Sequence, residues 1–226
     1  MALAFGVLEL AFFAANLTKV VHGGWLPLLI ASSVTFVMLT WRRGGDVITE
    51  RRTRLEGPLE WLGSFLAREK PIRVPGTAIF LHPNTPTIPL ALRVNVHLNK
   101  TLHEQVLIVS TIVENVPHVP ASERVRVEEI GSGAHQVLLV PVHFGFKDEQ
   151  NAPMALLGAD DARLHHEHTQ AVYFLSRITI ERSDDPVMSR ARKRLFIAIA
   201  HNAASPITYF RLPQSRTVSL GSTVYL

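Results

Sequence analysis

The hydrophobic pattern divides the chain into an apolar N-terminal part and a longer part in which short apolar runs alternate with polar segments. No charged side chain occurs between Gly23 and Thr40. A helix of about 20 apolar residues crosses a hydrocarbon core of about 30 Å. Trp25 and Trp41 stand at the two ends of this run, and tryptophan rings favour membrane–water interfaces. The pattern therefore predicts a membrane span rather than a buried core helix, which would show a polar face.

A second apolar run, ALAFGVLELAFFAANLTKVV, precedes this span and contains one carboxylate, Glu9. Only the short HGG segment separates the two runs, so we expect a tight glycine turn between antiparallel helices. An ionisable group inside a span costs a few kcal/mol unless it faces protein or water. Glu9 is therefore a candidate ion- or proton-pathway carboxylate, or else a structural intramembrane carboxylate that bonds to neighbouring helices.

Basic residues follow the span. Arg42 and Arg43 place its C-terminal end in the cytoplasm by the positive-inside bias, and two antiparallel spans would return Met1 to the same side. Apolar residues then recur at helical spacing from Ile48 to Leu66, between arginines. We expect a helix that either lies along an anionic inner leaflet or docks on the following domain, with Pro58 as a breaker.

From Arg73 onward, β-branched runs alternate with helical segments. Strands are expected at 76–81, at 104–114 and in AVYFLSRITIE, with a hairpin in RVRVEEIGSGAHQVLLVPV and an edge strand or hairpin in RTVSLGSTVYL. Helices are expected from about Pro89 to Asn99, and after Asp184 or Asp185 with Pro186 in the first turn. Such alternation with one antiparallel hairpin predicts an α/β domain with a mixed sheet.

The expected fold class is thus a membrane α-helical hairpin followed by a soluble α/β domain with a mixed sheet. We expect two membrane helices in residues 1–43, an amphipathic cytoplasmic linker in residues 44–72, and a cytoplasmic α/β domain in residues 73–226.

Composition narrows the possible functions. The 226 residues include no cysteine, which excludes a disulfide framework, a thiolate metal site and a cysteine nucleophile. The formal net charge is +4. Five basic residues gather just after the apolar run: Arg42, Arg43, Arg51, Arg52 and Arg54. Interleaved aromatics and a nucleic-acid motif are missing, so a membrane-flanking cluster is the simpler interpretation and no nucleic-acid partner is expected.

Imidazoles gather in RLHHEHT, where His165, His166, Glu167 and His168 are adjacent. Histidine ligands on one helix face need a spacing of three or four residues. A polar loop is therefore the better interpretation, and a tethered metalloenzyme is the weakest alternative. The GSG turn lacks the strand-to-helix switch and the lysine of a phosphate loop. We expect no catalytic residue, no cofactor and no bound metal.

Several long motifs resemble one family. ELAFFAANLTKVVHGGWLPLLI followed by MLTWRRG resembles the last two spans of the KUP/HAK/KT bacterial potassium uptake transporters. The cytoplasmic C-terminal domain of that family is similar to RVPGTAIFL, NVHLNKTLHEQVLIVSTIVENVPHVPASERVRVEEIGSGAHQV, HFGFKDEQNAP and HNAASPITYFRLPQSRTVSLGSTVYL. Glu9 stands where the family usually has an acidic residue, more often aspartate, whereas RLHHEHT has no counterpart there.

The resemblance implies potassium import coupled to protons, in the cell (inner) membrane, by a multi-pass core whose C-terminal domain lies in the cytoplasm. In such folds broken helices build the ion site, and no such helices occur in these 226 residues. We therefore expect the C-terminal portion of a transporter (a split gene, a truncated reading frame or a mis-assigned start) that does no transport by itself. Its implied partners are potassium ions, protons, membrane lipid and a missing N-terminal core, with a homodimer left open.

The alternative is a protein of another class. A membrane-anchored regulatory module would use its α/β domain to bind a nucleotide or a protein partner at the carboxyl ends of the strands.

Overall fold

The computed structural model describes residues 2–83, 86–131, 136–164, 170–183, 185–202 and 205–225. The chain forms two compact units. The first consists of Met1–Val47 and Pro186–His201, and the second of Ile48–Asp185 and Asn202–Leu226. A long N-terminal helical part is followed by an α/β domain, as the sequence predicted.

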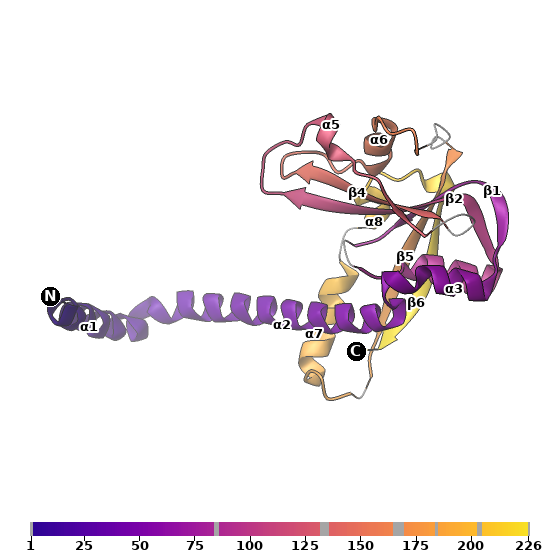
Figure 1. Ribbon diagram of the computed structural model, residues 1–226. Helices are drawn as coiled ribbons and strands as arrows, with labels where there is room; N and C mark the ends of the chain where they lie inside the picture. The colour runs from indigo at the N-terminus through magenta and orange to yellow at the C-terminus, as the bar shows by residue number, and fades with distance from the viewer. Residues whose placement is uncertain are drawn as a thin grey trace. The chain divides into compact units, whose positions relative to one another are not determined.

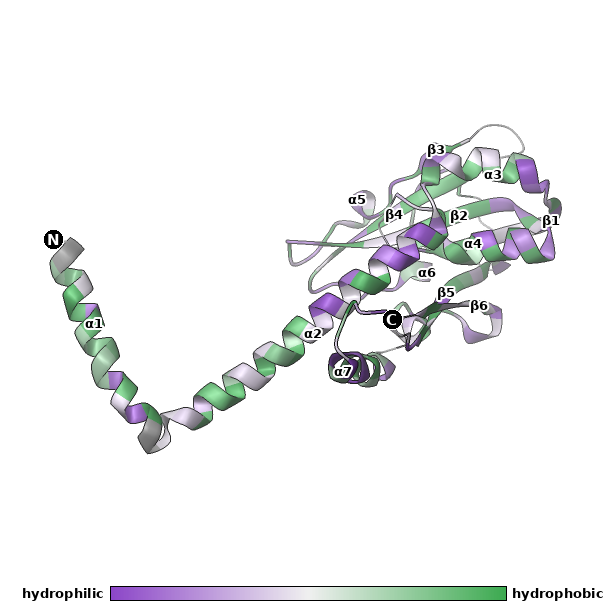
Figure 2. Ribbon diagram, turned by 90° about the horizontal axis from the view of Figure 1, so that it is seen from below, coloured by the Kyte–Doolittle hydropathy of each residue, from purple (hydrophilic) through white to green (hydrophobic). Residues whose placement is uncertain are grey.

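Two long helices begin the chain. α1 spans Ala2–Lys19 and α2 spans Trp25–Glu56. Val20–Gly24 between them is a π-helical segment, in which Gly23 has a φ of +129°. In place of the expected tight turn, this π-helical segment joins the two helices, and α1 and α2 run in clearly different directions (Figure 2). The antiparallel packing of the two helices, which depended on that turn, stays a prediction.

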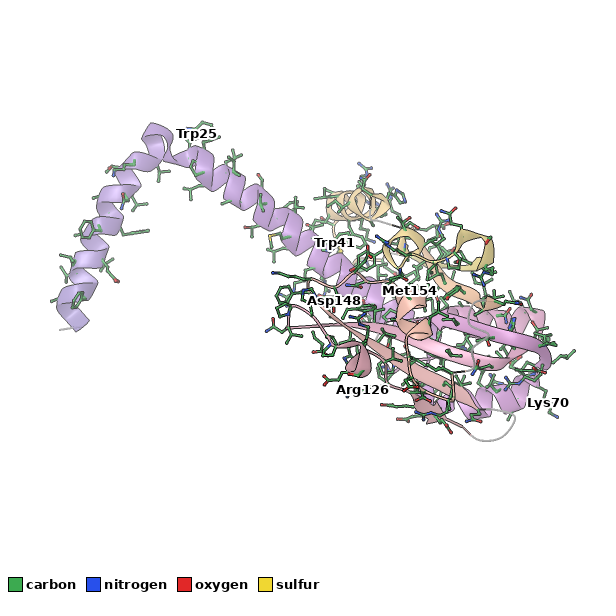
Figure 3. The ribbon with its side chains drawn as sticks, turned by 90° about the horizontal axis from the view of Figure 1, so that it is seen from above. Trp25, Trp41, Lys70, Arg126, Asp148 and Met154 are labelled. Carbon is green, nitrogen blue, oxygen red and sulfur yellow. The ribbon has the colours of Figure 1, made fainter. Side chains whose placement is uncertain are left out.

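The predicted span lies in the first part of α2. Among the residues that the structure describes, α2 is the one helix long and apolar enough to cross a membrane. Only 6% of its apolar window is buried, unlike the core helix of a soluble protein. Figure 2 shows hydrophobic residues around this part of α2, and Figure 3 places Trp25 near its start and Trp41 farther along. α1 does not meet the same criterion, so a second span stays a prediction.

α2 continues well past the span. It runs through Gly44 and Gly45 to Glu56, where the sequence predicted a separate linker helix. Gly57 then has a φ of +71° and Pro58 is extended, so the helix ends just before the expected breaker. A 3-10 turn, η2 (Leu59–Trp61), and the short helix α3 (Leu62–Glu69) follow.

Helix α7 spans Arg190–His201 and belongs to the first unit, where it packs on α2. It starts later than predicted, because Pro186 lies in a turn before the helix and not in its first turn. The Phe196 and Trp41 ring centroids are 5.3 Å apart. A Cβ atom on Gly44 would clash with the Phe196 ring. Glycine at this position therefore lets α7 approach the backbone of α2.

The second unit is built on one six-stranded sheet of order β3-β4-β2-β1-β5-β6 (Figure 1). Only β3 is antiparallel to its neighbour, and the other five strands are parallel. The strands are β1 (Ile72–Leu81), β2 (Thr101–Glu114), β3 (Glu128–Ile130), β4 (Val137–Gly145), β5 (Val172–Glu181) and β6 (Thr217–Tyr225). The mixed sheet and the β3–β4 hairpin are thereby confirmed, although hairpin residues 132–135 lie outside the described ranges.

Helices cover both faces of the sheet, as buried parallel strands require. Along β1, Ala78 and Phe80 face one apolar core and Ile79 and Leu81 face the other. The first core is covered by α3 and by α4 (Leu90–Val94), which continues as the π-helical η3 (Asn95–Asn99). The second is covered by α6 (Ala152–Leu157) and α8 (Pro206–Tyr209). The small elements α5 (Ala121–Arg124) and η6 (Gln214–Arg216) lie in connections.

The strand order makes β1 the switch point of the sheet. The chain adds β2 and β4 on one side of β1, then crosses and adds β5 and β6 on the other side. In doubly wound sheets, ligands bind outside the carboxyl ends of the strands at such a reversal. The carboxyl end of β1 is therefore the expected position of a ligand site.

Candidate functional site

Glu9, the candidate predicted from the sequence, lies on α1 and is exposed. Its neighbours one turn away are Phe5 and Phe13, both also exposed. Within the described part of the chain, Glu9 has no hydrogen-bond or ion-pair partner. The carboxylate therefore lies unpaired on an apolar surface of α1. Inside a membrane, such a group is stable only if it faces protein or water.

The histidine-rich stretch is not part of the described structure. His165, His166, Glu167 and His168 all lie outside the described residues. Among the residues that are described, no group of three or more His, Asp or Glu side chains is arranged to hold a metal ion.

Four polar side chains, which we call the polar network, meet at the carboxyl end of β1: Arg52, Glu56, His82 and Thr87. Glu56 ends α2 and is 1% exposed, while His82 directly follows β1 and is also buried. The Thr87 hydroxyl donates to Glu56 Oε2 at 2.7 Å, and Arg52 Nε donates to Glu56 Oε1. The carboxylate is therefore paired through both of its oxygens, as a buried charge requires.

The network also sets the state of its histidine. Since the Thr87 hydroxyl gives its proton to Glu56, it accepts from His82 Nε2, 2.9 Å away. The other ring nitrogen, Nδ1, then faces Arg52 Nη2 at 3.5 Å. Burial, and secondarily the charge of Arg52, lowers the pKa of His82 to about 4. His82 is therefore neutral at physiological pH.

Backbone bonds reinforce this junction. The Leu59 amide donates to the Pro86 carbonyl at 2.9 Å, and the Ile88 amide donates to the Gly57 carbonyl at 3.0 Å. The polar network thus fixes the end of α2 to the loop after β1. Its hydrogen bonds join α2 to the end of β1, which is the arrangement of a structural clamp.

An arginine-lined pocket, with a cavity volume of about 330 Å³, lies beside this clamp in the same unit. Arg93 Nη1 donates to the carbonyl oxygens of Leu55 and Glu56, at 2.9 Å for Glu56. The guanidinium carbons of Arg68 and Arg93 lie 5.8 and 5.7 Å from the Phe65 ring centroid. The full lining is Arg54, Glu56, Gly57, Trp61, Ser64, Phe65, Arg68, Ile88 and Arg93. Because Glu56 is paired internally, the pocket presents positive charge and suits an anionic group.

The HFGFKDEQ stretch has a structural role. The Asp148 carboxylate accepts from the backbone amides of Val119 (3.0 Å) and Gly145 (2.8 Å) and pairs with His118 and Arg124. The Val119 bond is the largest of the contacts that lower the pKa of Asp148. A Cβ atom on Gly145 would clash with the Pro117 carbonyl. These residues tie the loop after β2 to the loop after β4.

Neither the polar network nor the arginine-lined pocket was predicted from the sequence. The available signal was the end of the AIFL run, where His82 follows four apolar residues and stands at the carboxyl end of a buried strand.

Known proteins match the chain in two blocks. Residues 1–46 match the K+ potassium transporter integral membrane domain, and residues 75–226 match the K+ potassium transporter C-terminal domain. The chain belongs to the K+ potassium transporter family. In this family, a Cutibacterium acnes protein is 40% identical over 98% of the chain, and a Rhodococcus jostii protein is 42% identical over 96%. Both carry the name probable potassium transport system protein Kup.

A third family member, the Kup protein of Nitrosomonas eutropha, is 37% identical over the whole chain. The chain spans about a third of the length of these relatives, since 35%, 34% and 35% of each is covered. No solved structure matches it.

Proposed function

We propose that this chain supplies membrane spans and the cytoplasmic domain of a transporter that imports potassium together with protons. The observation that carries the proposal is the order of the two matches, a membrane block at 1–46 followed by a C-terminal block at 75–226. The relatives are named as potassium transport proteins, which supports a transporter component rather than an enzyme.

In this proposal the protein is multi-pass in the inner membrane, and the α/β domain faces the cytoplasm. Support comes from Arg42 and Arg43, which follow the apolar run of α2. The ion site is built by the part of the relatives that this chain does not match, because two spans are too few to enclose a pathway.

Growth at low potassium tests the proposal in a bacterial strain without other uptake systems. A chimera, in which the chain replaces the matched third of the Rhodococcus relative, should restore growth, and the 226 residues alone should not. Rescue by the 226 residues alone would contradict the proposal. So would a chimera that reaches the membrane in normal amounts but takes up no potassium.

Substitutions at Glu9 in the same chimera separate its two candidate roles. If Glu9 lies on the proton pathway, Glu9→Asp should keep the proton dependence of uptake and Glu9→Gln should lose it. If Glu9 is a structural hydrogen-bonding group, both variants should keep that dependence, and Glu9→Gln should change mainly the amount of folded protein. Potassium uptake with and without a protonophore measures the difference.

The arginine-lined pocket favours a second candidate, a regulatory domain that binds a phosphate-bearing ligand such as a nucleotide. Trp61 is 63% exposed at its rim and offers a surface for stacking. ATP should quench the tryptophan fluorescence of the full chain in micelles, and Arg68→Gln should weaken the effect while Arg182→Gln should not. An unchanged spectrum at millimolar ATP removes this candidate.

A further inference from the structure

Helix α7 touches α2 inside the apolar run rather than beyond it. Arg192 Nη2 donates to the Leu39 carbonyl at 3.1 Å, and Arg192 Nε donates to Thr40 Oγ1 at 3.2 Å. The guanidinium carbon of Arg192 also lies 6.0 Å from the Phe36 ring centroid. Phe36, Leu39 and Thr40 all belong to the uncharged part of α2. α7 therefore packs against the last turns of the span itself.

The direction of α7 follows from how it meets α2. Figures 1 and 2 show α7 crossing α2 instead of running beside it. The Trp41–Phe196 contact and the close approach at Gly44 hold the crossing point. If α2 crosses the bilayer, α7 then lies along the bilayer surface.

The two sides of α7 differ in character. Leu195 lies three residues after Arg192 and Ile199 lies four residues after Leu195, so the three share one helix face. Because Arg192 reaches back to Phe36, this face points toward the hydrocarbon side of the contact. Arg194 and His201 lie on the opposite side and are exposed. Apart from Arg192, which bonds to α2, the apolar residues face lipid and the cationic residues face water, which is the pattern of an interfacial helix.

The positive charge of α7 indicates which partner its exposed side would bind. Residues 186–201 contain Arg190, Arg192, Lys193 and Arg194 and no carboxylate. Arg190 and Arg194 are exposed, whereas Lys193 is buried and Arg192 bonds to α2. Each exposed cation near an anionic leaflet favours binding about fivefold. A protein partner would need an acidic surface at the same depth, whereas phospholipid headgroups surround α2 wherever it spans.

We propose that α7 is an interfacial helix that rests on the inner leaflet, with Leu195 and Ile199 in the acyl-chain region and Arg190 and Arg194 on anionic phospholipid headgroups. The proposal rests on α2 being a membrane span. It assigns to a helix from the C-terminal part of the chain a lipid contact that is separate from the spans.

Single-cysteine spin labels test the proposal directly, because the chain has no cysteine of its own. Met38→Cys reports the depth of the span, and Ile199→Cys and His201→Cys report opposite sides of α7. The full chain is placed in nanodiscs of phosphatidylglycerol or of phosphatidylcholine. In phosphatidylglycerol, oxygen should relax the Met38 and Ile199 labels, and a water-soluble nickel chelate should relax the His201 label.

The charge variant Arg190→Gln/Arg194→Gln should shift α7 about 30-fold toward the undocked state in phosphatidylglycerol, since two cations are lost. Arg177→Gln/Arg182→Gln removes two exposed arginines elsewhere in the chain and should change nothing.

Three results overturn the proposal. If the nickel chelate relaxes the Ile199 label while the Met38 label lies in hydrocarbon, the interfacial position of α7 is refuted and the span is not. Equal oxygen access at Ile199 in both lipids refutes the choice of anionic lipid. A Met38 label in water refutes the span, and with it the membrane arrangement in the proposed function. Failed potassium uptake by a chimera whose labels sit at these depths leaves the lipid contact intact and refutes the transport proposal.

Discussion

The two halves of α2 make contacts of different physical kinds. Near Gly44, the contact with α7 is mainly one of shape, in which an aromatic ring fills the space left by a missing side chain. Near Glu56, the contact is a buried set of charges and hydrogen bonds. The first kind depends on volume and is insensitive to pH, whereas the second depends on protonation. Substitutions at the two places should therefore fail in different ways.

The largest effect is expected from Glu56→Ala. Removing one partner of a buried charge pair leaves Arg52 uncompensated, and such losses cost about 3–5 kcal/mol in the free energy of unfolding. Urea denaturation of the full chain in micelles measures this. Glu50→Ala is the matched control, because Glu50 pairs with Arg54 at the exposed surface of the same helix, and it should cost about 0.3–0.5 kcal/mol. Equal effects of the two variants would show that the polar network does not hold the end of α2.

Acidification should weaken the same clamp. The pKa of His82 falls from 6.5 in the unfolded chain to about 4 in the folded one, so between these values the unfolded chain binds a proton that the folded chain does not. The free energy of unfolding should therefore be highest above pH 6.5. Below that pH it should fall by about 1.4 kcal/mol per pH unit toward pH 4. Denaturation curves between pH 5 and 7 measure the slope. His82→Gln should flatten it; an unchanged slope would assign the pH dependence to other groups.

A smaller effect is expected where volume decides. Gly44→Ala places a methyl group against the Phe196 ring, and overpacking of this kind costs about 1–3 kcal/mol. A spin label at Ala198→Cys should become more mobile as α7 loosens. Gly45→Ala has open space around the new methyl group and should leave the label unchanged while favouring the helix. Similar label mobility in both variants would refute the close approach at Gly44.

The smallest effect concerns the polar bonds of α7. Arg192→Met should lose the bonds to Leu39 and Thr40 and weaken α7 docking by about 1 kcal/mol. Arg190→Met removes an exposed charge from the same helix and provides the control in the same label assay, with phosphatidylcholine nanodiscs to remove headgroup attraction. A larger effect from Arg190 would mean that charge alone, and not these bonds, positions α7.

Local sequence signals predicted the elements well and their long-range contacts poorly. The β-branched runs and the GSG turn predicted β1, β2 and the hairpin because strand pattern and turn chemistry are local. The role of Glu56 was not predicted, because a carboxylate in an arginine-rich helix is usually exposed to solvent. Its burial depends on His82 and Thr87, which are far from it in the sequence. The helix α7 was expected, but its docking on Gly44 was not, since a glycine gives no local sign of the ring that covers it. The sequence likewise predicted a separate linker after residue 43, whereas α2 continues through Gly44 and Gly45 to Glu56.

The Asp148 carboxylate also bears on how this domain can vary. Donors from the loop after β2 and from the end of β4 converge on one side chain, and Gly145 passes the Pro117 carbonyl with no space for a Cβ atom. Insertion or deletion of a single residue in either loop would carry at least one donor out of reach. We therefore expect these two loops to accept changes in residue identity at their exposed positions and to be intolerant of changes in length.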